Sequence, residues 1–327
     1  MNPHVVVYKK LPNELLAALR ARFRVTYFEA IDETNRAAFL EAMRDADGLL
    51  GASVRLDKAT LAPATRLKIV STISVGYDTF DVDDLTERGI LLAHTPGVLT
   101  ETTADTIFAL ILATARRVVE LAEFIKAGRW RHSLDESLYG VDVHSKTLGF
   151  LGMGRIGQAV ARRARLGFNM TILYHNLQPV PEVETAFGAR FLPLDEVLRA
   201  ADFICVVLPL SPETEKLVGA REFALMRPQA IFINGSRGRI VDEAALIEAL
   251  QQRKIHGAGL DVFEREPLPA DSPLLAMPNV VALPHIGSAT HETRLAMARL
   301  AVDNLIAGLD GERPRHLANG SVWSNRR

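Results

Sequence analysis

The sequence predicts two α/β domains, each built on a doubly wound parallel sheet, with one domain inserted into the other. Short apolar runs, typical of buried strands, alternate with helical patterns along most of the chain. A glycine-rich turn joins such a run to a helix near the middle, within residues 148–167. The length of 327 residues fits about two domains, and an apolar fraction of 48% is sufficient for buried cores.

The first hundred residues show this alternation clearly. We expect strands at residues 5–8, 24–28, 48–52, 67–72 and 90–94, with helices starting near residue 12 and spanning 34–44. Strands separated by helices form parallel βαβ units. Residues 100–127 keep helical periodicity over many turns and stop at Gly128, which predicts one long connecting helix followed by a loop over 129–145.

The glycine-rich turn reads Gly152-Met153-Gly154-Arg155-Ile156-Gly157 and follows the apolar run 148–151. In a Rossmann-like dinucleotide-binding unit, the first glycine makes the turn, the second lets the backbone approach a pyrophosphate, and the third lets helix and strand pack closely. Amides at the helix start would hold the phosphates. The motif alone is also compatible with a merely tight turn, but its place between strand and helix favours dinucleotide binding.

Further strands are expected at residues 171–175, 201–210, 230–236 and 256–263, with helices around residue 222 and over 242–252. The run 279–289 leads into a last long helix, 290–308, and then into a polar tail that we expect to be loose. We therefore expect a dinucleotide-binding domain over 101–285. It is inserted into a discontinuous domain made of residues 1–100 and 286–327.

Composition excludes several classes of function. The 38 Lys and Arg residues nearly balance 39 Asp and Glu, and a net charge of -1 provides no field to attract nucleic acid or an anionic membrane. The longest apolar stretch, around residues 107–112, is too short to cross a bilayer, and the N-terminus lacks the pattern of an export signal. The single cysteine, Cys205, lies in an apolar run, where it can form no internal disulfide. These features predict a cytoplasmic protein.

The end of the second strand of a dinucleotide fold bears on cofactor choice. An acid there favours NAD by bonding the ribose hydroxyls, whereas arginines favour NADP. This chain has neither, because the strand runs into His175-Asn176-Leu177-Gln178. The lack of an acid removes repulsion toward a 2′-phosphate, and His175 and Asn176 could bond either group, so the turn favours NADP(H) over NAD(H). An indifferent polar turn remains the alternative.

Three polar residues occur where later strands should end: Arg237 after IFINGS, Glu266 in DVFEREP and His285 in ALPHIGSA. Ligands of open α/β sheets gather at the carboxyl ends of strands, so the three could converge beside a nicotinamide. Taken singly, each has an ordinary explanation as a turn residue, a solvated acid or a satisfied histidine. Together they form the set that hydride transfer needs. No pattern of a serine nucleophile, a calcium loop, a zinc pair or a GxxxxGK loop is present, so no metal is expected.

With these residues, the chain resembles the D-isomer-specific 2-hydroxyacid dehydrogenase family, most closely its bacterial glyoxylate/hydroxypyruvate and 2-ketogluconate reductases. The resemblance covers nearly the whole chain, with the family's segments in the same order. They are VVVYKKLP, STISVGYDTFDVD, HTPGVLTETTADT, YGVDVHSKTLGFLGMGRIGQ, GFNMTILYH, AIFINGSRG, GLDVFEREPL and PHIGSATHETR.

The resemblance implies roles for individual residues. Arg237 would bind the substrate's carboxylate and carbonyl oxygen, His285 would donate the proton, and Glu266 would pair with that histidine. Backbone amides of the loop Ser74, Val75 and Gly76 in the substrate-binding domain would hold the carboxylate. The cofactor would contact Gly154, Arg155 and Ile156 at the pyrophosphate, Asp261 at the carboxamide, and Thr102 on the connecting helix. One departure is that relatives using NADP tend to carry arginines where this chain has Leu177 and Val180.

The expected activity is NAD(P)H-dependent reduction of a small 2-oxo acid, such as glyoxylate, hydroxypyruvate or 2-ketogluconate, to the D-2-hydroxy acid. The resemblance also implies a homodimer. Two alternatives remain open at this point. One is another activity of the family, of the phosphoglycerate, formate or phosphite dehydrogenase type. The other is a nucleotide-sensing scaffold like the related corepressors.

Overall fold

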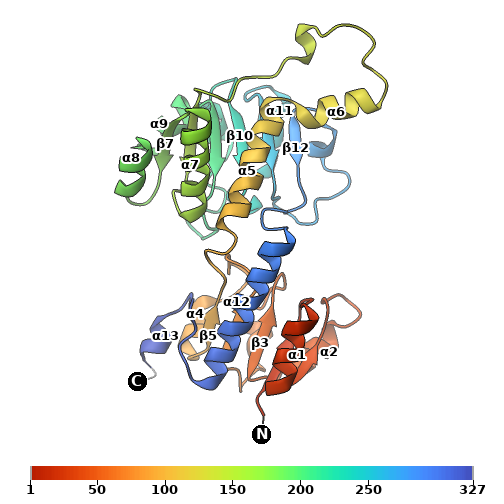
Figure 1. Cartoon of the computed structure of the whole chain (residues 1–327), viewed down its shortest axis with the longest axis vertical. Helices are drawn as coiled ribbons and strands as arrows, with labels where there is room; N and C mark the ends of the chain where they lie inside the picture. The colour runs from red at the N-terminus through yellow and green to blue at the C-terminus, as the bar shows by residue number, and fades with distance from the viewer. Residues whose placement is uncertain (1, 326–327) are drawn as a thin grey trace. The chain divides into compact units, whose positions relative to one another are not determined.

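Two parallel sheets organise the chain, one in each of two units (Figure 1). The computed structural model describes residues 2–325. The discontinuous unit consists of residues 2–99 and 290–325, and the central unit of residues 100–289. The predicted fold class, two parallel-sheet α/β domains, is confirmed. The expected boundaries, after residues 100 and 285, differ from these by one and four residues.

The discontinuous unit has a five-stranded parallel sheet in the order β2-β1-β3-β4-β5. Its strands are β1 (His4–Val7), β2 (Arg24–Tyr27), β3 (Gly48–Gly51), β4 (Ile69–Thr72) and β5 (Leu91–Ala93). Its helices are α1 (Asn13–Arg22), α2 (Arg36–Met43), α3 (Lys58–Leu61), α4 (Val82–Glu87), α12 (His291–Asp310) and α13 (Ser321–Ser324).

Both faces of this sheet are covered, which explains why its strands read as continuous apolar runs. On one face, α12 lies against β3, β4 and β5, and the hydroxyl of Ser71 donates a hydrogen bond to the carbonyl of Ala301 (2.8 Å). On the other face, Val70 packs in a core that includes Phe39 and Met43 of α2. Alternate residues of β4 therefore belong to different layers.

The central unit has a seven-stranded parallel sheet in the order β12-β11-β10-β9-β6-β7-β8. Its strands are β6 (Thr147–Leu151), β7 (Thr171–His175), β8 (Arg190–Phe191), β9 (Phe203–Val206), β10 (Ile231–Asn234), β11 (Gly257–Leu260) and β12 (Val280–Ala282). Its α-helices are α5 (Thr100–Ala115), α6 (Val118–Lys126), α7 (Arg155–Phe168), α8 (Pro181–Phe187), α9 (Leu194–Ala200), α10 (Ala220–Leu225) and α11 (Glu243–Gln251), and its short 3₁₀ turns are η1 (Glu136–Leu138), η2 (Gly238–Ile240) and η3 (Pro273–Ala276).

Side chains alternate across this sheet into two cores. Phe150 and Cys205 face the layer that contains Ile107 of α5 and Val160 of α7. Their strand neighbours Leu151, Ile204 and Val206 face the opposite layer, with residues of α9, α10 and α11. Cys205 is buried and free, in keeping with a packing role. Packing of helices on both faces of the sheet fixes the positions of the carboxyl ends of its strands.

The predicted single helix over residues 100–127 is wrong, because the helix breaks between α5 and α6. Arg117 adopts a left-handed backbone conformation (φ 54°). Its guanidinium bonds Glu120 and the carbonyls of Ser137 (2.6 Å) and Tyr139 (3.1 Å). These bonds to a segment some twenty residues further along offset the cost of the break.

The polar tail is also more ordered than expected. Asn319 is buried, accepts a hydrogen bond from the amide of Leu92 (2.8 Å) and donates one to the carbonyl of Ile90 (2.9 Å). It thus satisfies backbone groups at the edge strand β5, and the helix α13 follows it. The expectation of a loose tail was wrong for residues 317–324, whereas residues 326–327 lie outside the described part.

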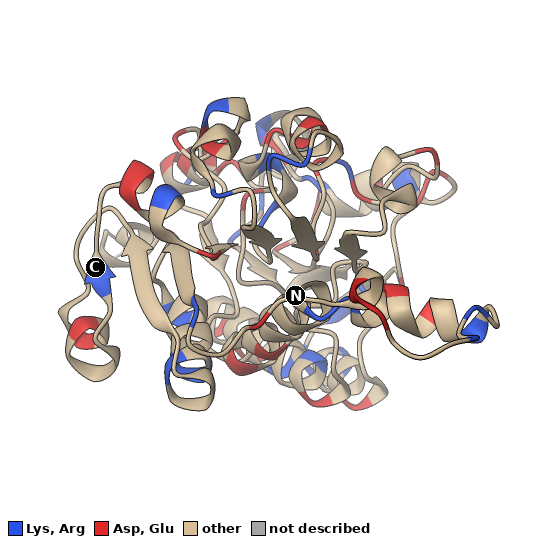
Figure 2. Cartoon of the chain, turned by 90° about the horizontal axis from the view of Figure 1, so that it is seen from above, with Lys and Arg blue, Asp and Glu red and all other residues tan. Residues whose placement is uncertain are grey.

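Charges of both signs are interspersed along the ribbon (Figure 2). Among the described residues, no helix is both long enough and apolar enough to cross a membrane. Nor do these residues contain a group of three or more His, Cys, Asp or Glu side chains that could hold a metal ion.

Candidate active site

The turn between β6 and α7 has the geometry that its three glycines predict. Gly152 has φ +96°, and a Cβ there would lie 2.8 Å from the carbonyl oxygen of Val207. A Cβ on Gly157 would lie 2.9 Å from the carbonyl oxygen of Gly152. Gly154, by contrast, precedes the first residue of α7 and has nothing within 4 Å of a Cβ position. The first and third glycines thus permit close packing, and the second leaves the helix N-terminus open to phosphates, which fits a dinucleotide.

The candidate catalytic residues follow three neighbouring strands. Asn234 of β10, Leu260 of β11 and Ala282 of β12 lie side by side at the ends of their strands. The turns after β10 and β11 then approach each other very closely. A Cβ on Gly238 would lie 1.8 Å from the carbonyl carbon of Phe263, a contact that only glycine can accommodate. This packing holds Arg237 beside the segment that carries Glu266.

Glu266 and His285 form a direct pair. His285 Nδ1 and Glu266 Oε2 are 2.7 Å apart, and Glu266 Oε1 accepts the amide of Phe263 at 3.0 Å. Burial acts to raise the pKa of Glu266, but the hydrogen bonds from His285 and Phe263 and the positive charges of His285 and Arg237 outweigh it, so this pKa lies below its ordinary value. The ionised carboxylate accepts a hydrogen bond from Nδ1–H, so Nε2 is the ring nitrogen that remains for other partners.

Asp261 fixes the turn that carries His285. The backbone of His285 is left-handed (φ 53°), and the next two amides, of Ile286 and Gly287, donate to the two carboxylate oxygens of Asp261 at 2.7 and 2.8 Å. Asp261 is buried, and burial raises the pKa of its carboxyl above the ordinary value although both amides act in the opposite direction. Such a clamp holds a backbone conformation that few residues other than glycine adopt readily.

The turn that carries Arg237 has a support that the sequence analysis missed. Asn234 is buried, its Oδ1 accepts the amide of Ser236 at 3.1 Å, and its Nδ2 donates to the carbonyl of Arg237 at 3.0 Å. The signal was present, because an asparagine that ends a buried apolar strand before Gly-Ser commonly bonds the following turn. Arg237 Nη1 in turn donates to the carbonyl of Ser236 (2.8 Å).

The first turn of α5 borders the same end of the sheet. A Cβ on Gly287 would lie 3.3 Å from Thr103 Cγ2 and 3.1 Å from Asp261 Oδ2, so the His285 turn passes between them. Thr102 belongs to this turn of α5, and its carbonyl accepts a hydrogen bond from the hydroxyl of Thr106 (3.3 Å).

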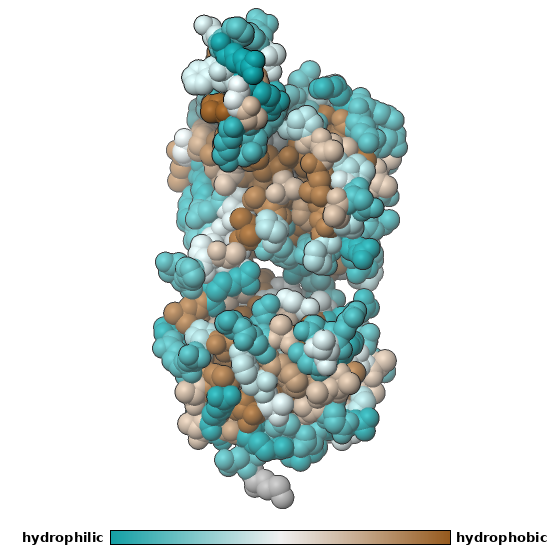
Figure 3. Space-filling model, turned by 90° about the vertical axis from the view of Figure 1, so that its right-hand side faces the viewer, coloured by the Kyte–Doolittle hydropathy of each residue, from teal (hydrophilic) through white to brown (hydrophobic). Residues whose placement is uncertain are grey.

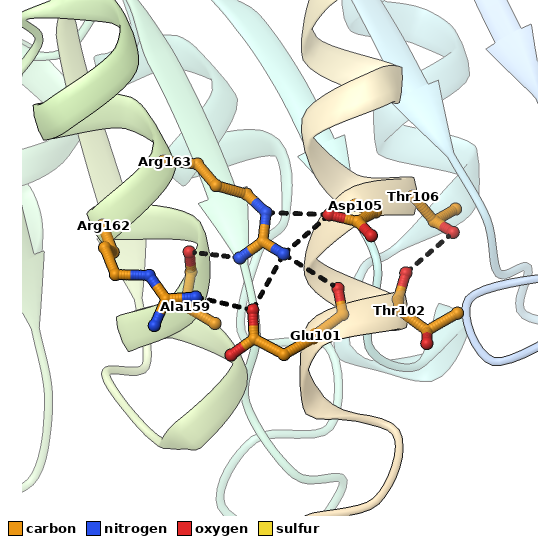
Figure 4. A network of polar contacts seen from close by, with 7 residues as sticks. All are labelled: Glu101, Thr102, Asp105, Thr106, Ala159, Arg162 and Arg163. Atoms are coloured by element: carbon orange, nitrogen blue, oxygen red, sulfur yellow. Dashed lines mark hydrogen bonds and ion pairs between the residues drawn. The ribbon is translucent and has the colours of Figure 1, made fainter. Parts of the chain in front are cut away.

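Ion pairs attach this first turn of α5 to α7 (Figure 4). Arg163 of α7 bonds Asp105 (2.6 Å) and Glu101 (2.8 Å), and Arg162 bonds Glu101 (2.7 Å). Because α7 begins at the glycine turn, the network connects the helix that follows this turn to the helix that carries Thr102.

The end of β7 lies next to the glycine turn, because the amide of Gly152 donates to the carbonyl of His175 at 2.9 Å. His175 Nδ1 donates to the carbonyl of Leu192 (3.1 Å), so the proton of the neutral ring lies on Nδ1. Asn176 Nδ2 donates to the carbonyl of Gln178 (3.0 Å), and Leu177 is 95% exposed. These are the side chains at the position that discriminates between the cofactors.

The segment Ser74–Gly76 belongs to the discontinuous unit, where it follows β4. All three of its carbonyls accept hydrogen bonds, from the amide of Thr95 (2.9 Å), the ring of His94 (2.9 Å) and the hydroxyl of Ser74 (2.6 Å). Within residues 2–325, nothing accepts a hydrogen bond from the amides of Val75 and Gly76. Two consecutive amides therefore have no acceptor among the described residues.

Comparison with known proteins gives the family. The family model for the NAD-binding domain of D-isomer specific 2-hydroxyacid dehydrogenases matches residues 108–287. The chain belongs to this family. Glyoxylate/hydroxypyruvate reductase B of Escherichia fergusonii is 58% identical over 98% of this dehydrogenase and 99% of its own length. The corresponding protein of Citrobacter koseri is 55% identical, over 98% and 99%.

Two solved structures share the dehydrogenase fold. The NADPH-dependent glyoxylate/hydroxypyruvate reductase of Sinorhizobium meliloti, in complex with NADP and malonate, has a TM-score of 0.87 and 36% identity, and 97% of each chain is covered. A glyoxylate reductase of Paecilomyes thermophila has a TM-score of 0.89 and 31% identity, over 98% of this chain and 99% of that one. The predicted resemblance is confirmed, and this dehydrogenase is an oxidoreductase with a nicotinamide dinucleotide cofactor.

Proposed function

We propose that this dehydrogenase reduces small 2-oxo acids to D-2-hydroxy acids. The observation that carries the proposal is the pairing of His285 with Glu266 beside Arg237, at the carboxyl ends of three adjacent strands. Glyoxylate and hydroxypyruvate are the first candidates, because relatives more than half identical over nearly their full length carry those names. 2-Ketogluconate is a longer candidate with the same 2-oxo acid group.

The residues of the central unit fit the cofactor. The open N-terminus of α7 at Gly154, Arg155 and Ile156 would hold the pyrophosphate, with Gly152 and Gly157 packing the turn beneath it. Asp261 and Thr102 would hold the nicotinamide end. When bound, the reduced nicotinamide supplies the hydride that the carbonyl carbon accepts.

The chain's own residues manage the charge and the proton. As the carbonyl carbon is reduced, negative charge grows on its oxygen, and the guanidinium of Arg237 stabilises that charge. His285 donates the proton from Nε2, because its Nδ1 is engaged by Glu266. The ionised Glu266 stabilises the imidazolium form that makes this donation possible.

The substrate carboxylate would bind the Ser74–Gly76 segment. The amides of Val75 and Gly76 have no acceptor among the described residues, so both are available to donate hydrogen bonds to a carboxylate.

NADPH is the cofactor that we propose over NADH. The end of β7 carries His175 and Asn176 and no acid, so nothing there repels a 2′-phosphate. A relative with 36% identity is described as NADPH-dependent and was solved with NADP.

A homodimer is the oligomeric state that we propose. Helix α6 has no buried residue although it is largely apolar, and the segment that follows it projects from the central unit (Figure 1). Trp130, Leu134 and Tyr139 on this segment are each more than half exposed. Figure 3 shows further apolar surface on the same unit. Such a surface is typical of a protein interface.

The direct test is oxidation of NADPH and of NADH in the presence of a panel of 2-oxo acids. We expect turnover with glyoxylate and hydroxypyruvate and a higher kcat/KM with NADPH. Activity confined to phosphoglycerate, formate or phosphite would transfer the protein to another branch of the family. Absence of turnover with every substrate would favour a nucleotide-binding scaffold.

A further inference from the structure

We propose that His94 is a positioning residue for the substrate carboxylate. Its ring holds the carbonyl of Val75 and thereby aims the amide of Gly76 at the anion. The proposal rests on the proposed function, because it concerns the loop that would bind the 2-oxo acid. His94 lies outside the trio Arg237, Glu266 and His285 and does not itself touch the reacting atoms.

The geometry follows from the planarity of the peptide bond. In a trans peptide, the C=O of one residue and the N–H of the next point in opposite directions. His94 Nδ1 donates to the carbonyl of Val75 at 2.9 Å, so the amide of Gly76 points away from His94. The amide of Thr95 bonds the carbonyl of Ser74 at 2.9 Å and fixes the amide of Val75 in the same way. Two neighbouring amides are thus presented without a protein acceptor.

The ring of His94 is itself held in place. Tyr77 packs edge-on against it, with ring centroids 5.3 Å apart and planes at 83°. Its backbone is anchored at both ends, since its carbonyl accepts Asn304 Nδ2 from α12 (3.2 Å) and its amide donates to the carbonyl of His316 (3.3 Å). A donor on a fixed frame loses little further freedom when it binds the loop, so it restrains the loop effectively.

The bond also defines which nitrogen carries the proton. A carbonyl oxygen can only accept, so the bonded tautomer of His94 has its proton on Nδ1. The amide nitrogen of an asparagine lies at a similar distance from Cβ as histidine Nδ1 and can donate in the same direction. A phenylalanine has nearly the same bulk but no donor. The pair of substitutions therefore separates the hydrogen bond from the packing.

The experiment compares His94→Phe with His94→Asn. One lost hydrogen bond corresponds to about a three- to tenfold change in affinity, so His94→Phe should raise KM for glyoxylate and Ki for malonate by about that factor. His94→Asn should stay within about twofold of the unchanged protein. The dissociation constant of NADPH should be the same in all variants. His144→Phe is the matched control, because His144 is 71% exposed in the central unit.

The possible results are distinguishable. Unchanged KM and Ki in His94→Phe would overturn the proposal while leaving the proposed function intact. The proposal would also be overturned if His94→Phe weakened the binding of glyoxylate and of NADPH equally. It would be overturned as well if His94→Asn lost as much affinity for glyoxylate as His94→Phe while its thermal midpoint stayed unchanged. If the unchanged protein reduces no 2-oxo acid, the proposed function fails instead. In that case, calorimetry of malonate binding to the NADPH complexes of the unchanged protein, His94→Phe and His94→Asn tests the role of His94 separately. Equal affinity in all three would overturn that role.

Discussion

Replacing Glu266 by glutamine tests the pairing of Glu266 with His285 most directly. The carboxylate accepts two donors on different oxygens, His285 Nδ1 at 2.7 Å and the amide of Phe263 at 3.0 Å. A glutamine has one acceptor oxygen and an NH₂ group, so it can satisfy only one of these donors. If its oxygen keeps Phe263, its NH₂ faces Nδ1 and moves the ring proton to Nε2 in the neutral ring. The imidazolium form then loses its charged partner.

The magnitude follows from the strength of the bond and its exposure. A hydrogen bond to a charged group contributes about 1.5–3 kcal/mol. The side chains of His285 and Glu266 are 47% and 37% exposed, so solvent screening places the loss near the low end, about 1.4–2 kcal/mol. We therefore expect kcat to fall about 10- to 30-fold.

The assay is the steady-state rate of NADPH oxidation with glyoxylate across pH, with cofactor binding measured in parallel. Glu264→Gln is a matched control, because Glu264 is an exposed acid two residues away. Its kcat should stay within about twofold of the unchanged protein. A Glu266→Gln enzyme with unaltered kcat would refute the role of the pair.

The same substitution has a defined effect on stability. The pKa of Glu266 is lower in the folded protein than its ordinary value, so folding favours the ionised form. That contribution is fully present above the unfolded pKa, about 4.3, and is lost as pH falls through the folded pKa. The stability difference between the unchanged protein and Glu266→Gln should therefore shrink below about pH 4 in denaturant titrations. A difference that grows as pH falls would contradict the sign of the shift.

Four further substitutions test the site and the elements that support it. His285→Ala should lower kcat by about 10²- to 10⁴-fold with an unchanged NADPH dissociation constant, and wild-type turnover would reject it as the acid. Gly238→Ala should cost more than about 3 kcal/mol in denaturation, because its Cβ would lie 1.8 Å from a backbone carbon of Phe263. Gly167→Ala on α7, where a Cβ meets nothing within 4 Å, should instead stabilise by about 0.5–1 kcal/mol. Asn176→Asp should raise KM for NADPH about five- to tenfold by repelling the 2′-phosphate, with KM for NADH little changed.

Much of the fold could be predicted, because strands of a parallel sheet that are buried on both faces form continuous apolar runs in the sequence. The run at 148–151 lies within the observed strand β6, and the runs at 171–175 and 230–236 contain β7 and β10. The features that could not be predicted depend on tertiary contacts, which leave no local pattern in the sequence. Arg117 breaks a helix in a stretch with neither glycine nor proline, because carbonyls about twenty residues later accept its guanidinium. β8 has only two residues, too few for any pattern.

The candidate site was likewise predictable in part. Arg237 and His285 each lie three residues beyond a strand end, and β10, β11 and β12 are neighbours, so their proximity followed from topology. The support that His94 gives to the Ser74–Gly76 segment did not follow from the sequence. His94 shares no periodicity with the Val75 carbonyl that it bonds nineteen positions earlier, and only the folded chain brings them together.

The geometry of the trio is set mainly by backbone contacts. Gly238 lets the turn after β10 press against the main chain of Phe263, and the two oxygens of Asp261 hold consecutive amides after His285. Side-chain changes at Glu266 or His285 leave both contacts in place, so they should remove chemistry while the fold persists. A Cβ at Gly238 or the loss of the Asp261 carboxylate displaces the turns themselves. Substitutions of Glu266 or His285 should therefore lower activity at nearly unchanged stability, whereas substitutions of Gly238 or Asp261 should lower both. A site held together only by its reacting side chains would not show this difference.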